Sequence, residues 1–232
     1  MSDEGIFREV DEELRRQQLK EYWNKYGLYI IAVAIAIVVS VAGYKGWQFW
    51  SARQAAEAGS NYSKAQTLAD EGKSDAAAKL YRELAENGPK GYRVLSRLRL
   101  AASEAAAGQT DNAVKILDAL VANSNSDDVF QGFARIQAAM MRLDEAGYDE
   151  MVKRLGAMTA ANNSWRHSAR ELLGLSAYKA GRTEDAEKLY NEVIADREAP
   201  RNLRRRVEMM LALIVEASAG QASEVGAAGD GK

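Results

Sequence analysis

The chain has 232 residues and a nearly balanced charge, with 31 Lys and Arg against 33 Asp and Glu and a formal net charge of −2. This balance does not indicate a nucleic-acid-binding surface, so we expect no nucleic-acid partner. The chain has no cysteine, which excludes disulfides, thiol catalysis and thiolate metal sites. Prolines are rare, and alanine, leucine and charged residues are abundant, which predicts an all-α protein.

Residues 1–25 form a charged N-terminal segment with apolar residues at helical spacing, among them Val10 and Leu14. We expect this cytosolic segment to form a short amphipathic helix. Such a helix either lies at the membrane surface or docks onto a cytosolic partner.

Residues 26–44 contain no charged side chain, and Lys25 and Lys45 bracket this run of 19 residues. A helix of this length spans about 28 Å, close to the hydrocarbon thickness of a bilayer, so the run predicts a transmembrane helix. Aromatic side chains stand at both of its margins, as a membrane-interface belt requires. The predicted belt consists of Trp23, Tyr26, Tyr44, Trp47 and Trp50, and its last members belong to an aromatic juxtamembrane segment at 45–53.

A cleaved signal peptide is the alternative to an anchor, and Ser40-Val41-Ala42 could serve as its cleavage site. However, the apolar run is longer than the core of a typical signal, and the segment before it carries seven acids against five bases. We therefore predict an uncleaved signal-anchor. Basic residues are more frequent just before the span than just after it, which predicts a cytoplasmic N-terminus. The C-terminal domain is then expected on the other side of the membrane, which is the periplasm if the cell is a Gram-negative bacterium.

After the span, one pattern occurs three times: a glycine, then a hydroxyl residue at +2, an acid at +3 and an alanine at +5. The turn and packing residues of this pattern are Gly72 and Ala77, Gly108 and Ala113, and Gly181 and Ala186. Glycine can adopt the left-handed conformation that ends a helix, and the hydroxyl can cap the next helix as its N-cap. A degenerate copy without the glycine is centred on Ala146, with Met151 and Leu155 at its apolar positions.

This pattern resembles the tetratricopeptide repeat, a helical hairpin of about 34 residues. The resemblance implies a solenoid domain at 54–219 with about four hairpins and a capping helix. Residues 220–232 are glycine, alanine and small polar residues, a composition that predicts a disordered tail. The predicted elements are hairpins at 54–88, 90–124, 127–162 and 164–197 and a capping helix at 201–219. The chain departs from the family at its first bulky aromatic position, where Asn61, Arg97 and Arg170 stand.

No residue pattern indicates catalysis or the binding of a cofactor or metal. His167 is the only histidine, and without a cysteine partner it does not complete a normal zinc site, so we expect a surface or packing role. The chain has no glycine-rich phosphate loop. Arg201 and Arg204-Arg205-Arg206 form one basic cluster, which is either a solvated face or a contact for lipid headgroups or an acidic partner.

In tetratricopeptide stacks the first helix of each hairpin lines a concave groove, and the matching positions here are strongly apolar. This candidate protein-binding groove comprises Tyr62, Leu95, Leu98, Phe133, Ile136, Met140, Leu143, Leu175 and Tyr178. Two interpretations stay open: the groove receives extended apolar segments of other proteins, or the C-terminal helix folds back and covers it as core. Replacing Phe133 and Met140 with serine distinguishes loss of binding from loss of the fold.

The layout as a whole resembles the YfgM-like family of bacterial inner-membrane proteins. The resemblance rests on the segment from Leu19 to Gly27, the single span, the aromatic stretch from Gly46 to Trp50 and the divergent hairpins. It implies a non-enzymatic ancillary subunit of the SecYEG translocon that works beside a membrane-anchored periplasmic prolyl isomerase-like chaperone of the PpiD type. The implied clients are emerging secreted polypeptides. The alternative is a scaffold for cell-envelope or division-complex assembly that is unrelated to secretion.

Overall fold

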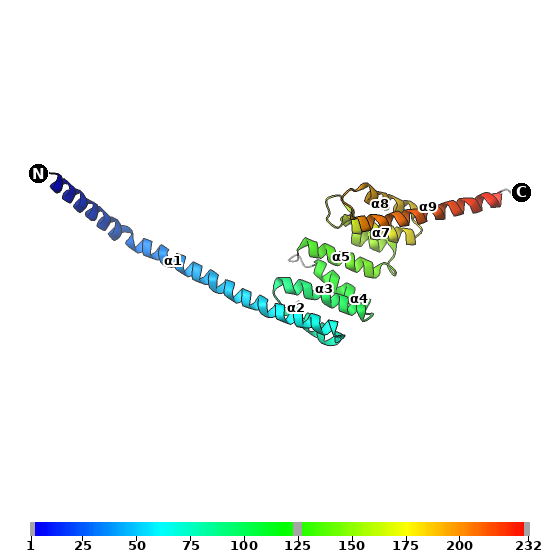
Figure 1. Cartoon of the computed structure of the whole chain (residues 1–232), viewed down its shortest axis with the longest axis horizontal. Helices are drawn as coiled ribbons and strands as arrows, with labels where there is room; N and C mark the ends of the chain where they lie inside the picture. The colour runs from blue at the N-terminus through cyan, green and yellow to red at the C-terminus, as the bar shows by residue number, and fades with distance from the viewer. Residues whose placement is uncertain (1–2, 123–126, 230–232) are drawn as a thin grey trace. The chain divides into compact units, whose positions relative to one another are not determined.

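The computed structural model describes the backbone of residues 3–122 and 127–229, and the side chains of Arg16, Lys20, Glu21, 23–122 and 127–217. Over this part of the chain it contains nine α-helices, one short 3₁₀ helix and no strand (Figure 1). The all-α prediction is therefore confirmed. The chain divides into two compact units, residues 1–57 and residues 58–232.

The first unit consists of most of helix α1 (Asp3–Asp70), which continues without a break into the second unit. The predicted N-terminal segment, span and juxtamembrane segment are thus successive parts of one helix. No proline occurs between residues 3 and 70. Nothing in this stretch therefore removes a backbone donor or clashes with the preceding turn. The glycines within it weaken helix formation without ending the helix.

The second unit stacks helical hairpins in chain order and ends in one further helix. Its elements after α1 are α2 (Ser74–Asn87), α3 (Lys90–Ala106), α4 (Thr110–Ala122), α5 (Asp128–Arg142), α6 (Tyr148–Leu155), the 3₁₀ helix η1 (Gly156–Thr159), α7 (Arg166–Lys179), α8 (Thr183–Ala195) and α9 (Arg201–Gly229). The last turns of α1 pack against α2 through a cluster that contains Ala65, Ala77 and Tyr81. This pair is the first hairpin of the stack.

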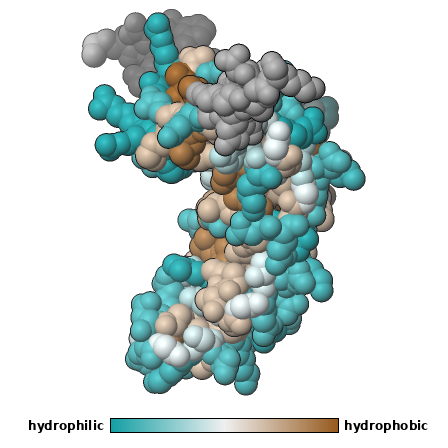
Figure 2. Space-filling view, turned by 90° about the vertical axis from the view of Figure 1, so that its right-hand side faces the viewer, coloured by the Kyte–Doolittle hydropathy of each residue, from teal (hydrophilic) through white to brown (hydrophobic). Residues whose placement is uncertain are grey.

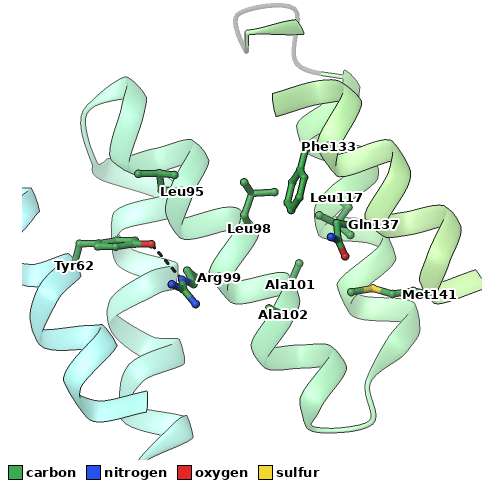
Figure 3. Close-up of a pocket in the computed structure, with 10 residues that line it drawn as sticks. All are labelled: Tyr62, Leu95, Leu98, Arg99, Ala101, Ala102, Leu117, Phe133, Gln137 and Met141. Atoms are coloured by element: carbon green, nitrogen blue, oxygen red, sulfur yellow. Dashed lines mark hydrogen bonds between the residues drawn. The ribbon is translucent and has the colours of Figure 1, made fainter. Parts of the chain in front are cut away.

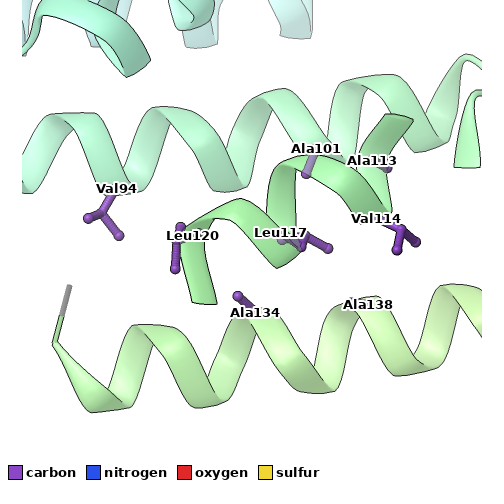
Figure 4. Close-up of a cluster of buried hydrophobic side chains, with 8 residues drawn as sticks. All are labelled: Val94, Ala101, Ala113, Val114, Leu117, Leu120, Ala134 and Ala138. Atoms are coloured by element: carbon purple, nitrogen blue, oxygen red, sulfur yellow. The ribbon is translucent and has the colours of Figure 1, made fainter. Parts of the chain in front are cut away.

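Each buried cluster is shared by successive hairpins, which makes the core continuous along the stack. The cluster in Figure 4 joins α3 and α4 to the following helix α5. Its members are Val94, Ala101, Ala113, Val114, Leu117, Leu120, Ala134 and Ala138. Half of them are alanines, so these helix backbones can approach closely. A hairpin of this kind buries its apolar side only against its neighbours, as in repeat proteins generally.

Three of the hairpin turns have the same backbone structure, a Schellman motif closed by glycine. Gly72, Gly108 and Gly181 have φ values of 77°, 77° and 73°. In the first turn, Gly72 N donates to the carbonyl of Ala69 at 3.0 Å and Lys73 N donates to the carbonyl of Leu68 at 2.8 Å. These two bonds satisfy carbonyls that the end of the helix would otherwise leave unpaired.

The predicted hydroxyl N-caps are wrong for two of these turns, those before α2 and α8. Lys73 and Arg182 are the N-cap residues of α2 and α8, and neither side chain forms a capping hydrogen bond. The backbone of each cap residue begins the next helix, since Ala77 N donates to the carbonyl of Lys73 at 3.1 Å. Because the Schellman turn ends only one residue beyond the glycine, the hydroxyl residues Ser74 and Thr183 are already the first residues of their helices.

The third hairpin lacks a turn glycine and has a different connection. Ala146 N donates to the carbonyl of Arg142 at 2.7 Å, and the next helix, α6, is short and is followed directly by η1. The apolar spacing nevertheless places Met151 and Leu155 in the core, where both are fully buried. The degenerate repeat therefore keeps its packing and changes its turn.

Helix α9 packs against α7 and α8 through one apolar side. Leu203, Val207 and Ile214 are buried in a cluster with residues of α7 and α8. The helix continues to Gly229, beyond the predicted end at 219. Alanine is frequent in this extension and favours helix. Residues 230–232 of the predicted tail lie outside the described part of the chain.

Candidate protein-binding groove

An open cavity of about 340 Å³ lies between the last turns of α1 and the helices α3, α4 and α5 (Figure 3). Its lining is mainly apolar and includes Leu95, Leu98, Phe133 and Met141. On the face of the molecule in Figure 2, hydrophobic residues likewise form patches between hydrophilic ones. The cavity is therefore an open, mainly apolar hollow in the repeat stack.

Helical periodicity explains why α3 and α5 both contribute to this cavity. Leu95 and Leu98 lie three residues apart on α3, and Arg99 and Ala102 lie four residues after each of them, a spacing that places all four on one face of the helix. Phe133, Gln137 and Met141 share one face of α5 in the same way. The stripes face each other across the cavity, and the buried residues Ala101 and Leu117 lie between them.

Tyr62 lies at one end of the cavity and is held by aromatic packing and a hydrogen bond. Its ring centroid lies 5.6 Å from that of Tyr81 and 5.9 Å from that of Tyr92. Arg99 Nε donates to the hydroxyl of Tyr62 at 3.3 Å, and this hydrogen bond raises the pKa of the Arg99 guanidinium. Burial raises the pKa of Tyr81, and the nearby Tyr62 adds to the shift. This end of the cavity therefore places the hydroxyl of Tyr62 beside the guanidinium of Arg99.

Phe133 lines the cavity from α5 and rests on Trp165, which precedes α7. The two ring centroids lie 5.9 Å apart. Gly132 makes room for the tryptophan, since a Cβ at that position would lie 2.2 Å from Cδ1 of Trp165. The indole is therefore packed tightly against α5, and it fixes the position of the Phe133 ring.

The structure brings together only part of the predicted groove. Tyr62, Leu95, Leu98 and Phe133 line the cavity. Ile136 belongs to a buried cluster, and Leu143 and Tyr178 pack against buried clusters. Met140 is 53% exposed. Neither Met140 nor the half-buried Leu175 lines the cavity.

Sequence reasoning missed several residues of the cavity. Arg99, Gln137 and Met141 line it but were not among the predicted positions. Arg99 lies four residues after Leu95, and Gln137 four after Phe133, so helical spacing alone would have found them. The prediction used only the groove positions of tetratricopeptide repeats, and these three residues are not at those positions.

The described part of α9 does not cover this cavity. No residue of α9 lines it, and α9 packs against α7 and α8 instead. At the other end of the stack, Tyr178 packs against a cluster that contains Leu203 and Val207 of α9. The apolar positions thus differ between hairpins: those of the first three hairpins that line the cavity are open, and Tyr178 packs against a cluster that includes α9.

The predicted packing alanines are buried, whereas the predicted membrane-belt residues are exposed. Ala77, Ala113 and Ala186 are all buried in the second unit. The belt residues on α1 are exposed by 45% to 63%; they are Trp23, Tyr26, Tyr44, Trp47 and Trp50. From Trp23 onward, α1 contains a stretch that is long and apolar enough to cross a membrane. This feature is compatible with a single-pass anchor.

A polar network ties α7 to the connection between α8 and α9. Arg166 Nε donates to Asp196 Oδ2 at 2.7 Å, and His167 Nε2 lies 2.8 Å from the same oxygen. The pKa of the Asp196 carboxyl is held well below its usual range by three hydrogen bonds. They come from the side chain of Arg166, the backbone amide of Glu198 and the ring of His167. Arg170 is buried at a position where the repeat family has an aromatic residue. Its Nε lies 3.0 Å from Oε2 of Glu192.

This network is suited to packing rather than to chemistry. His167 is buried and lies against a carboxylate that two arginines approach. Across the described side chains, no group of three or more His, Cys, Asp or Glu is placed to hold a metal ion. The arrangement holds helices together and offers no open ligand position.

The basic cluster at the start of α9 is not a single charged face. Arg204 Nη2 donates to the carbonyl of Asp196 at 3.0 Å, and Arg206 binds the carboxylate of Glu171 at 2.6 and 2.8 Å. Arg201 and Arg205 are exposed. Two of these arginines therefore connect α9 to other parts of the stack.

A protein-family model described as a tetratricopeptide repeat-like domain matches residues 20–215. The match includes the apolar part of α1 and all four hairpins. No curated protein and no solved structure matches the chain.

Proposed function

The chain belongs to the tetratricopeptide repeat-like family, and on that premise we propose that it is a membrane-anchored scaffold that binds other proteins through the cavity between α3 and α5. Repeat folds of this type act in protein–protein interaction and are typically not enzymes. The apolar stretch of α1 supports the anchor. The stacked hairpins support the role of a scaffold.

The open apolar cavity is the observation that carries this proposal. Its volume of about 340 Å³ lies within the range of about 300–1,000 Å³ typical of ligand pockets. Leu95, Leu98 and Phe133 offer apolar contact, and Tyr62 and Arg99 add polar groups at one end. This combination suits an extended segment with large apolar side chains, such as an unfolded protein presents.

We further propose that the clients are secreted polypeptides emerging on the periplasmic side of the bacterial inner membrane. In this proposal the chain is ancillary to the SecYEG translocon and works beside a membrane-anchored prolyl isomerase-like chaperone. The excess of basic residues before the span supports a periplasmic C-terminal domain. The resemblance to the YfgM-like family supports the assignment to the translocon.

Photo-crosslinking in cells tests the groove directly. A photoreactive amino acid is placed at Leu98 in the full-length chain, and a matched chain carries it at Val152, which is exposed on α6 and outside the cavity. We expect secreted polypeptides arrested during export to crosslink at position 98 and not at position 152. Equal labelling at both positions would rule out the cavity as the client site.

Two measurements test the location and the partners. Protease treatment of spheroplasts should degrade the repeat domain, since we expect it on the periplasmic side; protection would reverse the orientation. Purification of the tagged chain from mild detergent should recover translocon subunits and a periplasmic chaperone. Recovery of division or outer-membrane assembly factors without the translocon would instead favour an envelope-assembly scaffold.

A further inference from the structure

Arg99 is an unusual residue in the lining of an apolar cavity. Among the described residues that line the cavity, it alone carries a charge, and its side chain is exposed. Its Nε donates to the hydroxyl of Tyr62 (Figure 3). The N–H groups on its terminal nitrogens have no hydrogen-bond partner among the described residues. A guanidinium stays charged at any physiological pH, so a cation presents free donors to whatever fills the cavity.

The contacts of Tyr62 hold Arg99 in one orientation. The ring of Tyr62 contacts those of Tyr81 and Tyr92, so its hydroxyl has a defined position. An arginine that is held at Nε still presents both terminal nitrogens as a planar fork, and this fork matches the oxygens of a carboxylate. Ordering a long side chain costs entropy on binding. An arginine that is already held therefore binds a carboxylate at a lower cost than a free one.

No described carboxylate lies close enough to Arg99 to form an ion pair with it. Asp70, the last residue of α1, acts on the charge of Arg99 more weakly than Tyr62 does. Glu104, the one acid of α3, already lies 3.5 Å from Arg82 of α2. The charged residues of α3 are mostly basic, with Lys90, Arg93, Arg97 and Arg99 against Glu104. This wall of the cavity therefore has an excess of positive charge.

We propose that the cavity selects extended client segments in which an acidic side chain lies close to large apolar ones, and that Arg99 binds the carboxylate. This inference rests on the proposed function and adds a specificity to it. Side chains two residues apart in an extended chain point to the same side. An acid two residues from a leucine or phenylalanine could therefore reach Arg99 while the apolar side chain contacts Leu98 and Phe133.

The lining favours a single acid among apolar residues over the other kinds of segment. A run of several acids would lose hydration against the mainly apolar lining without a cation for each charge. A basic segment would be repelled by Arg99. A wholly apolar segment would remove water from the guanidinium and offer no counter-charge. One carboxylate beside apolar groups matches both the charge and the apolar walls.

The binding of three fluorescent peptides to the full-length chain in nanodiscs of neutral phosphatidylcholine tests the proposal. In each peptide leucine alternates with serine, and the central leucine is replaced by aspartate, asparagine or lysine. Aspartate and asparagine have nearly the same shape, so this pair isolates the charge. We expect the aspartate peptide to bind about fivefold more tightly than the asparagine peptide, the upper end for an ion pair at an exposed position. The lysine peptide should bind most weakly.

Substitutions of Arg99 assign the preference to this residue. Arg99→Met should bind the aspartate and asparagine peptides equally, and Arg99→Glu should prefer the lysine peptide to the aspartate peptide. The matched control is Arg97→Met, because Arg97 is a basic residue of the same helix that does not line the cavity. The control should keep the preference of the parent chain. Thermal unfolding of each variant checks that the fold persists, and empty nanodiscs correct for binding to lipid.

Equal affinities of the parent chain for the aspartate and asparagine peptides would overturn this inference and leave the proposed groove intact. A preference that Arg97→Met reduces as much as Arg99→Met would also overturn it, since the general charge of α3 would then be the cause. A chain that binds none of the peptides would overturn it as well. Photo-crosslinking at Leu98 reports separately on whether the groove binds clients, so failure of the proposed function is distinguishable.

Discussion

Gly174 shows how closely the two helices of the fourth hairpin approach each other. A Cβ at this position would lie 2.5 Å from Cε1 of Tyr190, which is fully buried. Because protein cores are packed about as densely as organic crystals, we expect the buried ring to move aside only by displacing its neighbours. The glycine therefore serves packing in this helix, not backbone conformation.

We predict that Gly174→Ala lowers the free energy of unfolding by about 1–3 kcal/mol, the usual cost of overpacking a core. Gly91→Ala is the matched control, since no atom lies within 4 Å of a Cβ at that position of α3. The control should be neutral or slightly stabilising, because alanine favours helix. Urea denaturation measures both variants, and equal effects would contradict the packing argument.

Asp196 makes part of the stability depend on pH. Its folded-state pKa is held below the usual range by Arg166, by the amide of Glu198 and by His167. A carboxylate with a depressed pKa stabilises the fold above its unfolded pKa of about 4, and the contribution is lost as the pH falls below that value. Asp196→Asn should therefore destabilise the chain more at pH 7 than at pH 3. Denaturant unfolding across this range checks the prediction, and an equal loss at both pH values would contradict it.

At the scale of elements, the Schellman turns define where each hairpin folds back. Gly108 combines a φ of 77° with open space around its Cα, so backbone conformation is the only reason for glycine there. An alanine at this φ is strained whatever the space available. The turn between α5 and α6 manages without such a glycine, which shows that interhelical packing can also specify a connection.

We predict that Gly108→Ala lowers the free energy of unfolding by about 1–2 kcal/mol and that Gly108→Asn costs less, since asparagine tolerates the left-handed region. Gly147→Ala serves as the control, because Gly147 has a φ of −69° and an equally open surrounding. Thermal unfolding monitored by circular dichroism compares the three variants. A loss at Gly147 as large as at Gly108 would show that backbone conformation is not the cause.

An exposed residue that lines the cavity can be changed to test client binding without a large loss of stability. Leu95 is 36% exposed, so Leu95→Ser should leave the melting temperature nearly unchanged while it weakens client crosslinking at position 98. Val129→Ser is the matched control, since Val129 is exposed on α5 but does not line the cavity. If both variants reduced crosslinking equally, the effect would not belong to the cavity.

At the scale of the whole molecule, the apolar stretch of α1 and the repeat stack differ in how their apolar side chains are covered. The apolar residues of α1 between 26 and 44 are exposed almost throughout, whereas those of the hairpins form shared cores. In water such a helix would leave a long apolar surface unburied, and a bilayer removes that cost.

We predict that Ile35→Arg combined with Val38→Arg releases the chain from membranes. Each arginine near the middle of a transmembrane helix costs about 2.5–3.5 kcal/mol on the insertion scale. Alkaline carbonate extraction measures the fraction that stays in the membrane pellet. The control variant, Ile35→Leu with Val38→Leu, should remain in the pellet. Retention of the arginine variant would argue against residues 26–44 as the membrane span.

The sequence by itself determined the fold class and the order of the hairpins. Both follow from local signals, namely apolar residues at helical spacing and glycines at a fixed distance from alanines, which need no knowledge of distant contacts. The apolar run in α1 is equally local. These features can be predicted without coordinates, because each depends on residues within one or two helical turns of one another.

Only the tertiary structure decided which apolar positions line a cavity and which enter the core. Phe133 and Ile136 lie three residues apart on α5, yet Phe133 lines the cavity and Ile136 is buried in a cluster with residues of α6, η1 and α7. The difference depends on Trp165 and on the shortened α6, which the sequence of α5 does not contain. Likewise, the path of α9 over α7 and α8 leaves the cavity open, since long-range packing and not local periodicity places that helix.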